Sequence, residues 1–132
     1  MSSVSTMCVL VASLMPIVCA GIAKSGTFSK PPSEGGYDNN APREWMARQH
    51  GWRQRANAAQ SNCFEALPFF IGAVLLAQQA GADQGRVDAL AVSFIVLRSA
   101  YIGCYLGDRA LARSVLFIAA FAVNVTLLLS GV

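Results

Sequence analysis

One apolar stretch of the chain, residues 54–79, carries polar side chains at spacings that could do chemistry. On a helix of about 100° per residue, Arg55, Asn62 and Glu65 fall within about 80° of one another. The stretch is otherwise apolar enough to cross a membrane, where an ionisable side chain costs on the order of 3 kcal/mol unless it faces a partner or a wet cavity. The pattern therefore predicts a polar site buried at membrane depth.

A second apolar stretch, residues 86–107, carries a matching helix face with three polar side chains, Arg98, Tyr101 and Tyr105. The turn and the start of the next stretch add Arg109, Arg113 and Ser114. The four arginines of this set outnumber its single carboxylate, and unpaired cations are costly in a low dielectric, so an anionic ligand is the expected partner. Arginine binds carboxylates through a planar fork, while Glu65 suits an ammonium group. We expect a small zwitterion with net negative charge.

Two other interpretations of these polar residues stay open. Glu65 could pair with Arg98 or Arg55 and fix the register of the helices, with the tyrosines filling space between them. Intramembrane charges also mark transport paths. The sequence shows no inverted repeat and no glycine-broken helix, and these absences count against a transporter.

The composition defines the elements that must position this site. The chain has 132 residues, 55% hydrophobic and 13% charged, about half the charge of a usual soluble domain. Four apolar runs predict helices at about 5–25, 54–79, 86–107 and 111–130, with a polar segment at 26–53. We expect an all-α membrane protein, a four-helix transmembrane bundle forming one domain over residues 1–132. A signal peptide is the rival interpretation of the first run, but no Lys or Arg precedes it and Pro16 interrupts it.

The basic residues indicate how the bundle is oriented. The net charge of +3 comes from arginines and lysines that cluster in the segment after the first helix and in the turn before the fourth. This is the pattern of cytoplasmic loops rather than of nucleic-acid binding, so no nucleic-acid partner is expected and both termini should face away from the cytoplasm. Trp45 and Trp52 lie among these arginines, as tryptophans at headgroup level do.

The four cysteines stand singly inside apolar runs, without metal-ligand or disulfide spacing. Their simplest interpretation is as small buried packing residues. A redox or ligand role for Cys63, beside Asn62, is the alternative.

Two motifs resemble those of a known family. Ala59-Gln60-Ser-Asn62-Cys63-Phe-Glu65-Ala-Leu-Pro68-Phe69 is similar to the signature Ala-(His/Gln)-x-Asn-x-x-Glu-x-x-Pro-x-Phe of the membrane-associated proteins in eicosanoid and glutathione metabolism, the MAPEG family. The second motif is Arg98-x-x-Tyr101-x-x-x-Tyr105 with Arg109 and Arg113-Ser114 after it. Ala58 stands where the catalytic eicosanoid enzymes carry an arginine, and Arg55, one helical turn earlier, is the candidate replacement.

The resemblance implies a homotrimer of four-helix subunits with glutathione bound between neighbouring subunits near the cytoplasmic leaflet. Asn62 and Glu65 would then hold the γ-glutamyl end of glutathione. Four further residues would complete the glutathione site: Arg55, Arg98, Tyr101 and Tyr105, with Arg109 beside them.

Arg113, next to Ser114, matches the arginine that one family branch places at the thiol of glutathione. A guanidinium there favours the thiolate, which is the reacting nucleophile. The expected activity is a glutathione-dependent transferase or peroxidase acting on a lipophilic electrophile or hydroperoxide that arrives from the lipid bilayer. The alternative is a non-catalytic scaffold that binds lipid or glutathione. The long polar loop resembles that of bacterial members, which implies a multi-pass protein of a bacterial inner membrane with its site towards the cytoplasm.

Overall fold

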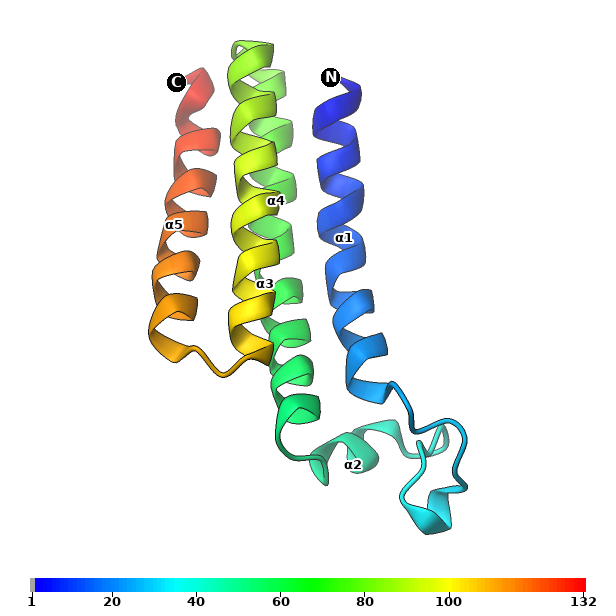
Figure 1. Ribbon diagram of the computed structural model, residues 1–132. Helices are drawn as coiled ribbons and strands as arrows, with labels where there is room; N and C mark the ends of the chain where they lie inside the picture. The colour runs from blue at the N-terminus through cyan, green and yellow to red at the C-terminus, as the bar shows by residue number, and fades with distance from the viewer. Residues whose placement is uncertain (1) are drawn as a thin grey trace.

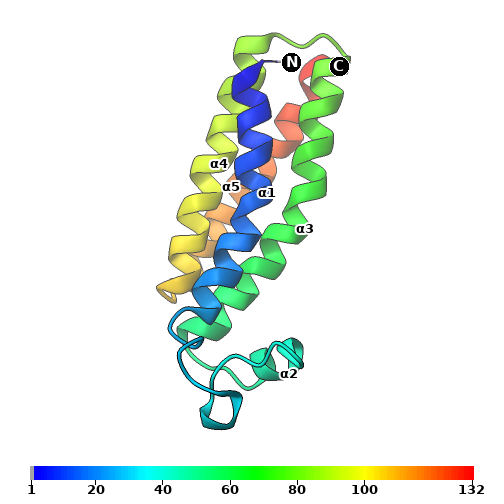
Figure 2. The same ribbon diagram turned by 90° about the vertical axis from the view of Figure 1, so that its right-hand side faces the viewer.

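The computed structural model describes residues 2–132 as a set of helices (Figure 1). Its elements are α1 (Ser3–Lys24), η1 (Pro32–Glu34), α2 (Pro42–Ala47), α3 (Trp52–Gln79), α4 (Gln84–Leu106), α5 (Ala110–Leu128) and η2 (Leu129–Gly131). The long helices α1, α3, α4 and α5 run side by side, with both termini at one end and α2 with its loops at the other (Figures 1 and 2). Within the described residues, four helices are long and apolar enough to cross a membrane.

Local sequence explains where the long helices begin. The side chain of Ser2 accepts a hydrogen bond from the backbone N–H of Ser5 and caps α1, and Asp83 caps α4 in the same way. α3 starts at Trp52, two residues earlier than predicted, directly after Gly51, whose φ of 63° needs the conformational freedom of glycine.

Small and apolar side chains hold the bundle together. α1 packs mainly against α3, and α5 packs mainly against α4. The rings of Phe70 and Phe94 stack across the α3–α4 contact with their centroids 4.2 Å apart. Buried alanines line these contacts and allow close approach of the backbones, as in membrane helix pairs. Large apolar side chains on the outer faces of α1 and α5, such as Ile17 and Ile118, remain exposed on the outside of the bundle. The prediction of an all-α, four-helix membrane bundle is confirmed, and the chain is an integral membrane protein.

A polar cluster joins α1 to α4 at the end of the bundle that holds both termini. One carboxylate oxygen of Asp88 accepts hydrogen bonds from Ser2 Oγ at 2.5 Å, Ser5 Oγ at 2.6 Å and Gln84 Nε2 at 2.8 Å. Each donor satisfies part of the acceptor capacity of the carboxylate, so this partly exposed charge is stabilised at the end of the bundle by three neutral donors.

The loop between α1 and α3 is folded around Trp45. Its ring packs edge-on against Tyr37, and its indole N–H donates to the carbonyl of Gly35. Trp45 is 1% exposed, so its ring is covered by the loop and does not face lipid headgroups, while the headgroup-level position of the segment stays a prediction. Four residues between α2 and α3 place Trp45 and Trp52 on different helices, and aromatic packing within the loop buries Trp45. Trp52 is exposed, as an interfacial residue would be.

Arg53 ties this folded loop to the bundle. Its guanidinium Nη1 donates to the carbonyl oxygens of Ala23 at 3.0 Å and Ser25 at 2.6 Å. These carbonyls lie at the C-terminal end of α1, where unpaired acceptors and the helix dipole both favour a cation. The first membrane helix and the start of α3 are therefore linked at this end.

Candidate functional site

A cavity of about 140 Å³ lies between α3, α4 and α5, and we call it the three-helix cavity. Three of the residues predicted for the site line it: Asn62, Glu65 and Arg98. Its remaining lining is mostly apolar and includes four phenylalanines, Phe69, Phe94, Phe117 and Phe121. Asn62 and Glu65 of α3 and Arg98 of α4 thus meet at one place.

Arg98 is the most unusual residue at this cavity, because it is charged and only 2% exposed. Its Nη2 donates to the sulfur of Cys63 at 3.4 Å, and its guanidinium lies 4.1 Å from the centre of the Tyr101 ring. Cys63 also contacts the thiol of Cys19 on α1. A sulfur atom and a ring face are weak partners for a buried cation. Arg98 therefore lacks a strong hydrogen-bond acceptor among residues 2–132, and an anionic group would supply one.

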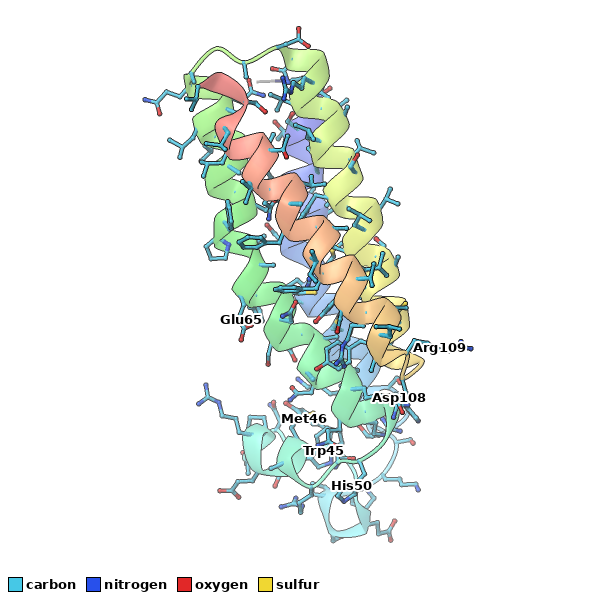
Figure 3. All side chains as sticks on the ribbon, turned by 90° about the vertical axis from the view of Figure 1, so that its left-hand side faces the viewer. Trp45, Met46, His50, Glu65, Asp108 and Arg109 are labelled. Atoms are coloured by element: carbon cyan, nitrogen blue, oxygen red, sulfur yellow. The ribbon has the colours of Figure 1, made fainter. Side chains whose placement is uncertain are left out.

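Glu65 does not serve as that partner within the described chain. It is exposed on the outer side of α3 (Figure 3). Arg98 is hydrogen-bonded to Cys63, and Arg55 Nε donates to the carbonyl of Leu106 at 3.1 Å. In residues 2–132 neither arginine is hydrogen-bonded to Glu65. A carboxylate exposed at membrane depth is unfavourable in lipid unless a partner or water reaches it.

Arginines and tyrosines alternate in a column that leads from Arg98 to the end of α4, and we call it the Arg–Tyr column. Tyr101 lies under the Arg98 guanidinium and meets Tyr105 edge-on at 5.7 Å. The Arg113 guanidinium of α5 lies 4.3 Å from the centre of the Tyr105 ring. Each contact places a cation over an electron-rich ring face or joins two rings edge to face. The column brings Arg98, Tyr101, Tyr105 and Arg113 together, and their contact with a ligand stays a prediction.

The other three predicted residues lie apart from the cavity. Arg55 is used to satisfy a terminal carbonyl of α4. Arg109 is exposed at the start of α5 and extends away from the bundle (Figure 3). Ser114 is exposed although it follows Arg113. The structure does not bring these three to the three-helix cavity, and their contact with a ligand stays a prediction.

Asn124 is a cavity residue that the sequence prediction did not include. It is 3% exposed, lines the three-helix cavity, and its Oδ1 has no hydrogen-bond partner in the described chain. The Oδ1 atom of Asn62 is unpaired in the same way. The sequence does contain a signal for this residue: it is a single asparagine in the middle of the last apolar run, on the same helix face as Phe117.

A second hollow, about 610 Å³ in volume, lies on the surface between α2 and α3. Two cations, Lys24 and Arg43, border it, and polar side chains of α3 form its floor: Gln54, Asn57, Gln60 and Ser61. It is several times larger than the three-helix cavity and far more polar. Among the described residues, no cluster of His, Cys, Asp and Glu could hold a metal ion.

A four-helix membrane bundle with an intramembrane Asn, Glu and Arg at one cavity and an Arg–Tyr column beside it defines a narrow class of integral membrane protein. The sequence model of the MAPEG family matches residues 4–132. The chain belongs to the MAPEG family. No curated protein and no solved structure matches the chain.

Proposed function

We propose that this protein is a glutathione-dependent transferase or peroxidase that acts on lipophilic electrophiles or hydroperoxides. The observation that carries the proposal is the Arg–Tyr column, which places the Arg113 guanidinium over Tyr105 and continues through Tyr101 to Arg98 of α4. A guanidinium fixed beside a thiol stabilises the thiolate. Membership of the MAPEG family is consistent with this chemistry.

The size of the three-helix cavity limits how glutathione binds. A cavity of about 150 Å³ holds a molecule the size of benzene, so the tripeptide cannot enter a cavity of about 140 Å³ whole. We infer that glutathione lies along the outer side of α3, with its ammonium at Glu65 and its carboxylates at arginines. Asn62 and the two tyrosines then bind its peptide groups.

Glu65 also supports the proposed homotrimer. Its exposed carboxylate lies on a helix long and apolar enough to cross the membrane, and such a charge is stabilised by a cavity or a protein partner rather than by lipid. A neighbouring subunit placed against this face would enclose both Glu65 and a bound glutathione. The basic loop around Arg43 and Arg48 favours a cytoplasmic orientation for this end, in a bacterial inner membrane.

The ultraviolet absorbance of a thiolate tests the proposal directly. Adding glutathione to the purified protein in detergent should produce that absorbance, and calorimetry should report binding. The signal should vanish in Arg113→Ala and persist in Arg86→Ala, a matched control at the opposite end of the bundle. Turnover with a chlorinated nitrobenzene or an organic hydroperoxide should follow the thiolate signal.

A scaffold that binds glutathione or lipid without turnover is the second candidate. The position of Arg109 and Ser114, exposed and away from the cavity, favours it, because these side chains then do not assist a reaction. Glutathione binding without a thiolate signal or turnover would select the scaffold. Absence of any glutathione binding would contradict both functions.

A further inference from the structure

Two cysteines from different helices meet inside the bundle beside Arg98. Cys19 of α1 and Cys63 of α3 are both buried, and their side chains are in contact within one cluster. The other two cysteines lie elsewhere: Cys8 belongs to a different core cluster, and Cys104 is half-buried near the end of α4. Thiols that already touch are candidates for a disulfide, and this one would join α1 to α3.

Arg98 makes the two sulfur atoms unequal. Its Nη2 donates to the sulfur of Cys63 at 3.4 Å. A neutral thiol is a weak acceptor, whereas a thiolate is an anion that a guanidinium stabilises. Loss of the Cys63 proton would therefore give Arg98 the anionic acceptor that it lacks. Oxidants react with the thiolate form of cysteine, so Cys63 is the sulfur that reacts first and Cys19 is the one that follows.

The sulfur of Cys63 is shielded from water but lies close to the three-helix cavity. A space of about 10 Å³, with room for about one water molecule, lies next to Cys63. Three residues line both this space and the three-helix cavity: Ala66, Phe94 and Arg98. A molecule in the three-helix cavity is thus one layer of side chains away from Cys63. Phe117 and Phe121, which are exposed, border that cavity on α5, so a lipophilic molecule can enter past them.

We propose that Cys63 and Cys19 form a dithiol that reduces lipophilic hydroperoxides. The Cys63 thiolate attacks the outer oxygen of the hydroperoxide: an S–O bond forms, the O–O bond breaks, and the leaving alkoxide takes up the proton that Cys63 lost and becomes an alcohol. The Cys19 sulfur then attacks the resulting sulfenic acid. The S–S bond forms, the S–O bond breaks, and hydroxide leaves with the Cys19 proton as water.

The electrons balance within this sequence of steps. One hydroperoxide is reduced by two electrons, and two thiols are oxidised to one disulfide. Two equivalents of an external thiol such as glutathione reduce the disulfide again by thiol–disulfide exchange. The inference rests on the proposed function only for the class of oxidant, a lipophilic hydroperoxide. It does not use a glutathione thiolate at Arg113.

Peptide mapping after exposure to a hydroperoxide tests this proposal. Full-length protein in peroxide-free detergent is reduced, freed of reductant and treated with cumene hydroperoxide without glutathione. Two of its four thiols should disappear. After acid quenching, alkylation and denaturation, trypsin releases residues 1–24, which contain Cys8 and Cys19, and residues 56–86, which contain Cys63. Mass spectrometry should find these two peptides joined until reductant is added. Hydrogen peroxide should act more slowly, because its path to Cys63 is apolar.

Three variants assign the roles of the side chains. Cys19→Ala should stop the reaction at the sulfenic acid, which dimedone then traps on Cys63. Arg98→Met should slow the oxidation at least about tenfold, through loss of a hydrogen bond to a charged sulfur. Cys8→Ala is the matched control on α1 and should form the disulfide at the wild-type rate.

Several results would overturn the proposal. These are a wild-type protein that keeps all four thiols, a disulfide that requires Cys8, and equal oxidation rates in the wild type and Arg98→Met. Circular dichroism checks that each variant is folded; if Cys19→Ala does not fold, the wild-type peptide map and Cys8→Ala still decide the pairing. The thiolate absorbance of glutathione, recorded on wild-type protein without peroxide, tests the proposed glutathione chemistry separately. Its absence would leave the disulfide result standing, and a missing disulfide would leave the absorbance result standing.

Discussion

Replacing Arg98 with methionine tests whether this arginine binds a ligand or holds the bundle together. An arginine at the centre of a membrane helix costs about 2.5–3.5 kcal/mol. Against this, the contact with the Tyr101 ring contributes up to about 2 kcal/mol, and the bond to the Cys63 sulfur about 1 kcal/mol. These terms nearly cancel, so Arg98 adds little to the stability of the unliganded protein.

Methionine has a similar length and no charge to desolvate, and such replacements of buried charges are often neutral or stabilising. We expect unliganded Arg98→Met to be as stable as the wild type or more stable by about 1 kcal/mol. The stabilisation that glutathione gives, in contrast, should be smaller in the variant than in the wild type. Glutathione at a hundred times its dissociation constant should stabilise the wild type by about 2.7 kcal/mol and the variant by much less.

The assay is unfolding in detergent followed by circular dichroism, with and without glutathione. Arg86→Met, an exposed position at the start of α4, is the control and should leave both values unchanged. If Arg98 were instead required to stabilise the unliganded protein, Arg98→Met would lower its free energy of unfolding by about 3–5 kcal/mol, the loss seen when a buried charge network is broken. That result, or full stabilisation of the variant by glutathione, would refute the reasoning.

Three further predictions concern other parts of the molecule. Glu65→Gln should weaken glutathione binding by about 1–3 kcal/mol in calorimetry, through loss of a charge-assisted bond to the ammonium; an unchanged affinity would remove Glu65 from the site. Asp88→Ala should lower the free energy of unfolding by about 1–3 kcal/mol, because it leaves Ser2, Ser5 and Gln84 without their shared acceptor; glutathione binding should not change. Arg53→Ala should cost about 1 kcal/mol of stability and expose the loop to protease, because two carbonyls at the end of α1 lose their donor; protease resistance equal to that of wild type would contradict this role.

The four membrane helices could be predicted from the sequence because each one must be apolar along its whole length to cross the bilayer. The face shared by Arg98, Tyr101 and Tyr105 followed equally directly from the helical period, and the structure arranges these side chains in one column. Both inferences concern a single helix.

Features that depend on how helices rotate against one another were not accessible. Cys63 shares a helix with Asn62, yet its contact with Arg98 depends on the α3–α4 packing. Asn124 is one polar residue in an apolar run, and its position in the cavity is set by the rotation of α5. The burial of Trp45 was not accessible for a related reason: its neighbours in sequence are basic, but its neighbours in space are Tyr37 and the backbone of Gly35.

The three-helix cavity also bears on how the protein responds to hydrostatic pressure. Pressure favours states that eliminate internal void volume, and the volume change of unfolding scales with the voids that are lost. The side chains of α3, α4 and α5 leave a space of about 140 Å³ between them, so we expect the subunit to be more compressible there than at the end where Ser2 and Asp88 are hydrogen-bonded. A ligand bound in that space would make the middle of the bundle less compressible. The pressure at which the protein unfolds would then report whether the space is occupied, without any chemical label.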